Sequence, residues 1–87
     1  MKTLKDFDRE TNRVKQSYME DQIKYNLPFK FEQIETESSM TFIISNKILS
    51  TVVSLDQTFG FMTTTVIGRH QLEKCLQMQN EVEKGQL

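Results

Sequence analysis

The hydrophobic period of the sequence changes at Pro28, so the chain is expected to combine helix and sheet. Upstream of this proline, apolar or tolerant side chains recur in steps of three and four residues, as on one face of an α-helix. Thr3 and Asp6 resemble a capping box at the start of this helix, and Pro28 keeps Leu27 out of helical dihedrals. The sequence therefore predicts a helix over residues 1–26, with a stripe of Leu4, Phe7, Thr11, Val14, Tyr18 and Tyr25.

Downstream of the proline the period is two, which is typical of strands that bury one face. Phe29 and Phe31 alternate with charged residues and predict a first strand, and a last strand is expected near 59–67. A closing helix is predicted over 69–84, with Leu72, Cys75, Leu76, Gln79 and Val82 on one face. The predicted fold class is α+β: an N-terminal helix, a four-stranded antiparallel sheet over 29–67 in meander order, and a C-terminal helix.

The central segment 40–55 predicts a hairpin that turns at 45–47, where Asn46 is expected to adopt a positive φ. The loop is either Ser45-Asn46 or Asn46-Lys47. Both choices give the same two faces, because side chains alternate along a strand. The apolar face is expected to form the core and carries Met40, Phe42, Ile44, Leu49, Thr51, Val53 and Leu55. The other face is expected to be half-covered by a loop, a symmetry mate or a partner, and carries Thr41, Ile43, Ser45, Ile48, Ser50, Val52 and Ser54.

Length and composition indicate one small folded domain spanning residues 1–87, with 37% apolar and 26% charged side chains. A chain of this size buries only about 60% of its unfolded surface, so homo-oligomerisation would add useful stability. No apolar run is long enough to span a membrane, no secretory signal pattern is present, and the single Cys75 excludes an internal disulfide framework. A cytoplasmic location is expected. The net charge of −1, without a basic stripe, argues against duplex DNA as a partner.

The stretch TFGFMTTTVIGRH contains the main candidates for a binding surface. The face that Phe59 and Phe61 occupy depends on the length of the turn that follows Leu55, because one residue of slip reverses every side chain. A two-residue turn would place Phe59, Phe61, Thr63, Thr65 and Ile67 on the half-covered face, as an aromatic platform. A three-residue turn would send both phenylalanines into the core, and it is favoured because Gln57 suits a two-residue hairpin poorly.

The triplet Phe59-Gly60-Phe61 resembles the aromatic strand motif of RNA-recognition domains. Gln57 stands where that motif has a basic residue, and Thr64 stands at its last aromatic position. The nearest match to the second motif, FIISN, lies too close upstream to leave room for the helix that separates the two central strands. That fold is therefore not expected, and the triplet keeps only a general capacity to stack bases.

Gly68, Arg69 and His70 form a candidate anion site, because free backbone N–H groups at a helix start favour anions. His70 and Cys75 are five residues apart on the predicted helix and point to different sides, so they form neither a metal pair nor a nucleophile–base pair. The acids Glu32, Glu35 and Glu37 are interpreted as solvated side chains. We therefore expect no catalytic residues, no metal site and no cofactor.

These observations predict a non-enzymatic protein-binding or regulatory module whose partner-binding residues are Ile43, Ile48, Val52, Phe59 and Phe61. The chain lacks alanine and is poor in glycine, proline and arginine, which indicates an AT-rich genome such as that of a low-GC bacterium or its phage. A phage or mobile-element origin would make inhibition of a host protein, in the host cytoplasm, the expected form. The alternative is a binder of a small ligand or single-stranded nucleic acid, with Phe59 and Phe61 stacking on bases and Arg69 with His70 binding phosphate.

Overall fold

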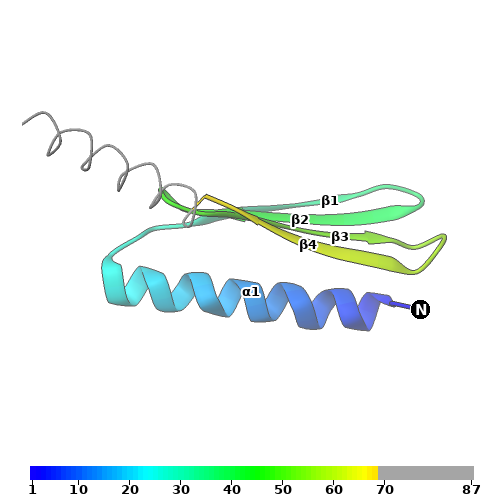
Figure 1. Ribbon diagram of the computed structural model, residues 1–87, viewed down its shortest axis with the longest axis horizontal. Coiled ribbons are helices and arrows are strands. Elements are labelled where there is room, and N and C mark those ends of the chain that lie inside the picture. The colour runs from blue at the N-terminus through cyan, green and yellow to red at the C-terminus, as the bar shows by residue number, and fades with distance from the viewer. Residues whose placement is uncertain (69–87) are drawn as a thin grey trace, which may run out of the picture.

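A computed structural model describes residues 1–68 as one long helix packed on one face of a four-stranded antiparallel sheet (Figure 1). The elements are α1 (Leu4–Tyr25), β1 (Lys30–Glu35), β2 (Ser39–Ser45), β3 (Ser50–Asp56) and β4 (Phe61–Ile67). The strands lie in the sheet in the order of the sequence. The predicted N-terminal helix and antiparallel meander of an α+β fold are thus confirmed, whereas the helix predicted over 69–84 lies outside the described residues.

α1 has defined signals at both ends. The carboxylate of Asp6 accepts a hydrogen bond from the backbone N–H of Thr3 at 2.8 Å, which is one half of the predicted capping box, and a second from the Thr3 hydroxyl at 3.2 Å. The backbone bond holds the pKa of Asp6 below its usual value, because it stabilises the charged carboxylate. At the other end Asn26 adopts the left-handed conformation, with φ 54°, and ends the helix just before Pro28.

The core lies between α1 and the two central strands, β2 and β3. Its buried apolar side chains are Phe7, Val14 and Tyr18 from the helix and Met40, Phe42, Ile44, Val53 and Leu55 from the sheet. The hydroxyl of Tyr18 lies 2.9 Å from the hydroxyl of the buried Thr51, so a polar pair joins the helix to β3 inside this core. The outer members of the predicted helical stripe, Leu4 and Tyr25, are exposed.

β2 and β3 alternate strictly between side chains that face α1 and side chains that face away from it. The covered face, packed against α1, contains the cross-strand pairs Met40–Leu55, Phe42–Val53 and Ile44–Thr51. The opposite side is called the open face and contains the pairs Thr41–Ser54, Ile43–Val52 and Ser45–Ser50. This division agrees with the two faces predicted from the sequence. Within residues 1–68, α1 covers one face of the sheet and no element lies on the other (Figure 1).

Candidate functional site

The open face combines apolar and hydroxyl side chains from all four strands. At its centre Ile43 pairs with Val52, and both side chains are half-buried. Two exposed apolar side chains, Ile34 and Ile67, lie diagonally beside this pair, and Phe61 lies on the same face at the end of β4, opposite Asp56. Serine and threonine fill most of the other positions: Ser39, Thr41, Ser45, Ser50, Ser54, Thr63 and Thr65. The charged members are Lys30, Glu32 and Asp56. Lys30 and Asp56 lie at the ends of their strands and Glu32 lies on the edge strand opposite Ile43, so the part of the open face between the ends of β2 and β3 carries no charge of its own.

A loop of residues 57–60 decides which face Phe61 occupies, because Asp56 pairs with Phe61 across β3 and β4. The carboxylate of Asp56 accepts hydrogen bonds from the backbone N–H groups of Thr58 at 2.9 Å and Phe59 at 3.3 Å. The N–H of Gly60 donates to the carbonyl of Asp56 at 2.8 Å. Gly60 has φ 64°, a conformation that glycine adopts without steric cost. The favoured three-residue turn, which would have buried both phenylalanines, was therefore wrong.

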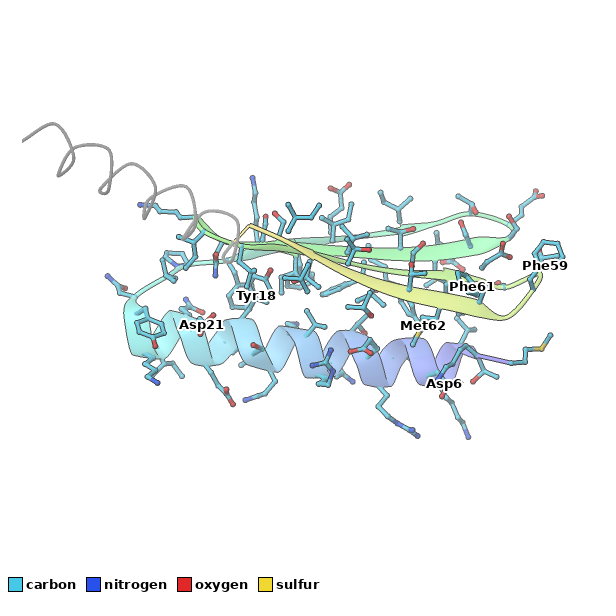
Figure 2. The ribbon with its side chains drawn as sticks, viewed as in Figure 1. Asp6, Tyr18, Asp21, Phe59, Phe61 and Met62 are labelled. Atoms are coloured by element: carbon cyan, nitrogen blue, oxygen red, sulfur yellow. The ribbon has the colours of Figure 1, made fainter. Side chains whose placement is uncertain are left out.

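Both phenylalanines of the TFGF stretch are exposed. Phe61 is 65% exposed and lies on the open face. Phe59 is 77% exposed and lies at the tip of the β3–β4 turn, whereas Met62 points from β4 toward α1 (Figure 2). A longer loop with the same parity as a two-residue turn gives the same face to the strand that follows. Phe61 thus occupies the face that the two-residue turn predicted, while Phe59 belongs to the turn itself.

Ile48 lies in the turn between β2 and β3 and not on the strand positions of the open face. Ser45 pairs with Ser50, which leaves residues 46–49 as the loop, and the N–H of Asn46 donates to the carbonyl of Leu49 at 2.9 Å. The side-chain carbonyl of Asn46 accepts a hydrogen bond from the N–H of Ile48 at 2.9 Å. Asn46 is not among the described residues with positive φ, so that prediction and both two-residue loops were wrong. The parity was right, which is why the two faces were assigned correctly.

Gly68 lies beside the β2–β3 turn. Its φ is 123°, and a Cβ at this position would meet the backbone oxygen of Ile48 at 2.7 Å, so both conformation and space favour glycine. Phe61 stands at the other end of β4, about 20 Å away at the rise of an extended strand. Arg69 and His70, the other members of the predicted anion site, lie outside the described residues. In the predicted nucleic-acid or ligand binder, Phe61 would stack on a base at one end of β4, whereas the anion site would begin with Gly68 at the other end.

Phe31 is half exposed, yet its ring contacts neighbours on the covered side of the sheet. Its centroid lies 5.7 Å from that of Phe42 and 6.5 Å from that of Phe29, and the Nζ atom of Lys15 lies 4.3 Å from the centroid. Phe29 in turn meets Tyr18 edge-on at 6.1 Å. These aromatic contacts extend the core toward β1, and Phe31 is therefore not part of the candidate surface.

Titratable side chains of residues 1–68 form no group of three or more potential metal ligands. Glu32 lies on the open face and Glu35 on the opposite side of β1, so alternation along the strand separates these two predicted solvated acids. Cys75 lies beyond the described residues. In the part of the chain that is described, no helix is long and apolar enough to cross a membrane.

Comparison with known proteins gives no relative from which a function could be transferred. The chain matches no protein-family model, and neither the curated proteins nor the solved structures give a match. The role of the open face must therefore be argued from its own residues.

Proposed function

We propose that this chain is a non-enzymatic protein-binding or regulatory module that presents the open face of its sheet to a protein partner. The observation that carries this proposal is the apolar centre of a face that residues 1–68 leave uncovered, where Ile43 pairs with Val52 and the exposed side chains of Ile34 and Ile67 lie diagonally beside them. An antiparallel sheet whose second face meets only water usually carries polar residues there. Apolar and aromatic side chains without central charges are instead typical of the core of a protein interface.

The energetics of the open face favour a partner with an apolar, weakly charged surface. Covering a Val, Ile or Phe side chain fully is worth about 1.5–3 kcal/mol relative to exposure. Hydroxyl side chains around Ile43 and Val52 can exchange water for hydrogen bonds to a partner, and burying them costs less than burying charges. The charged side chains Lys30, Glu32 and Asp56 are placed to form a polar rim.

Two further predicted residues would lie at the ends of such an interface. Phe59 projects from the β3–β4 turn, and Ile48 lies in the β2–β3 turn at the opposite end of the sheet. A partner that covers the whole face could reach both, whereas a smaller partner would contact only the centre, around Ile43 and Val52. Substitutions of Phe59 and Ile48 would therefore show how far the interface extends along the sheet.

The coding bias of the sequence supports a more specific form of this function. A small phage or mobile-element protein can inhibit a host protein in the host cytoplasm simply by occupying its surface. This mode of action needs no catalytic group, cofactor or metal. It would also place the partner in a low-GC bacterium, which defines the lysate to use.

The alternative, a binder of a small ligand or single-stranded nucleic acid, is supported by the exposure of Phe59 and Phe61. Two observations weigh against it. Asp56 lies directly opposite Phe61 in the ladder and would repel a phosphate, and Gly68, which precedes Arg69 and His70, lies at the far end of β4. Salt separates the two functions, because phosphate-driven binding weakens steeply as salt rises and an apolar protein interface does not.

The test compares three immobilised forms of the full chain in nuclease-treated lysate of a low-GC bacterium at high salt. They are the unaltered protein, Ile43→Lys/Val52→Lys on the open face, and Gln16→Lys/Gln22→Lys on exposed positions of α1. We expect the unaltered and helix forms to retain one discrete protein, and the open-face form to lose at least about tenfold in affinity for it. Circular dichroism checks that all three forms are folded.

Equal retention of that protein by all three folded forms would contradict the proposal. Material that is released by nuclease or by modest salt would instead favour the nucleic-acid alternative. In that case Phe59→Ala and Phe61→Ala should weaken retention, because both remove a stacking ring.

A further inference from the structure

The two edge strands of the sheet differ in charge. β1 has the sequence KFEQIE and carries three charged side chains, whereas β4 has the sequence FMTTTVI and carries none. Charged side chains on an edge strand oppose pairing with another strand, and an uncharged, β-branched edge favours it. β4 is therefore the edge of this sheet that is suited to accept a further strand.

The outer backbone of β4 is open within residues 1–68. β4 is the last strand in the sheet, and β3 is the strand with which it pairs. The N-terminal segment reaches only the preceding loop, where the N–H of Lys2 donates to the carbonyl of Gly60 at 2.9 Å. Val66 is 62% and Ile67 is 52% exposed. About every second residue of this seven-residue strand therefore presents its N–H and C=O groups outward, without a described partner.

The order of side chains in β4 is nearly the same in both directions. Two apolar residues at each end enclose three threonines. If β4 of a second copy paired antiparallel about Thr64, the opposite residues would be Thr64 with Thr64, Thr63 with Thr65, Met62 with Val66, and Phe61 with Ile67. Aromatic–β-branched and Thr–Thr pairs of this kind stabilise antiparallel sheets by about 0.2–1 kcal/mol each. The strand is therefore complementary to itself in this register.

We propose that a second copy of this chain pairs with the outer edge of β4, antiparallel and centred on Thr64, to form one continuous sheet from both copies. The contact is isologous, so it closes at two copies and leaves β1 as the outer, charged edge on each side. Cross-strand partners share a face, so the two open faces lie on the same side of the joined sheet. The dimer uses backbone groups of an edge, and it does not rest on the proposed function.

A charge-complementation experiment tests both the interface and its register. The full chain is prepared as Thr63→Lys/Thr65→Lys and as Thr63→Glu/Thr65→Glu. Each variant alone puts like charges directly opposite each other twice, and an equimolar mixture puts lysine opposite glutamate twice. Sedimentation velocity at concentrations up to about 1 mM should show a dimer for the unaltered chain, monomers for each variant, and a mixed dimer for the mixture.

A matched control places the same substitutions on the other edge. Glu32→Lys/Ile34→Lys adds two lysines to the open face of β1, as the lysine variant does on β4, and should leave the dimer intact. The proposal is overturned if the unaltered chain stays monomeric, if both β4 variants dimerise as the unaltered chain does, or if the mixture associates no more than its components. Persistence of the dimer in both variants would place the interface elsewhere, on the open face or on residues 69–87.

A second measurement covers the case in which the charged variants do not fold. In the Cys75→Ser background, Thr64→Cys places a thiol on the two-fold axis, where paired Cα atoms lie about 4.5–5.5 Å apart and a disulfide is possible. Thr63→Cys is the control, because Thr63 would face Thr65 of the second copy and not itself. Mild oxidation should link two copies efficiently only in the Thr64→Cys chain, and equal linkage in both variants, or none in either, overturns the register.

Discussion

Ile43 and Ile44 are neighbours on β2, yet they have different surroundings. Ile44 is fully buried between the sheet and α1, and Ile43 lies half-buried on the open face beside Val52. Both faces of the central strands therefore carry apolar side chains, but these have different roles. Side chains of the covered face hold the fold together, and those of the open face remain available. A single long helix buries one side of the two central strands, and the apolar side chains on their other side are the basis of the proposed partner.

The largest difference in stability is expected between alanine variants of the two isoleucines. Ile44→Ala should destabilise the fold by about 2–5 kcal/mol, because it removes buried methyl groups and leaves a cavity under α1. Ile43→Ala should cost only about 1 kcal/mol, since solvent already reaches this side chain. Urea unfolding measures both values. Equal costs for the two variants would mean that the open face is packed as tightly as the covered one.

An intermediate effect is expected for the polar pair inside the core. Tyr18→Phe removes a hydroxyl 2.9 Å from that of Thr51, which is 2% exposed, and should cost about 1–3 kcal/mol because a buried polar group loses its partner. Adding Thr51→Val should recover part of the loss, since both polar groups are then gone. Chemical unfolding of the single and double variants checks this, and a double variant less stable than Tyr18→Phe would argue against the pair.

The smallest effect concerns Asp6, at the start of the helix that covers the sheet. Its folded pKa is lowered, chiefly by the hydrogen bond from the backbone of Thr3, so its contribution to stability is complete above the ordinary aspartate pKa. The contribution is lost as pH falls through the lowered pKa. Asp6→Asn should therefore be slightly less stable than the unaltered chain at neutral pH, with a difference that shrinks on acidification. Thermal unfolding at several pH values measures this difference in stability. A difference that grows toward low pH would contradict the lowered pKa of Asp6.

Within residues 1–68 the sequence predicted the helix, the four strands and the two faces of the central strands well, because these depend on the hydrophobic period alone. The change of period at Pro28 marked the end of the helix, and the alternation along β2 and β3 placed Ile43 and Val52 on the open face. Face assignment tolerates errors in loop length that preserve parity. That is why the wrong loops around Asn46 did not disturb the assignment of the core.

The turns could not be predicted from the same signals. The β3–β4 loop depends on the side chain of Asp56, which accepts two backbone hydrogen bonds, and on Gly60 with its positive φ. Both residues are visible in the sequence as DQTFG, and an Asp that opens a turn together with a Gly that closes it was the signal for a longer loop. Because only loops of two and three residues were considered and the three-residue loop was favoured, Phe59 and Phe61 were expected in the core. The exposure of both rings is therefore what the structure adds to the candidate site.

The most direct test of the open face as a binding surface is photo-crosslinking in cells of a low-GC bacterium. A benzophenone amino acid replaces Val52 on the open face or, as the control, Gln16 on the exposed side of α1. After irradiation and purification under denaturing conditions, mass spectrometry identifies what each position has bonded to. We predict a discrete partner protein joined through position 52 and absent from position 16. Crosslinks from position 52 only to residues 69–87 of the same chain would contradict it, because the chain would then cover its own open face.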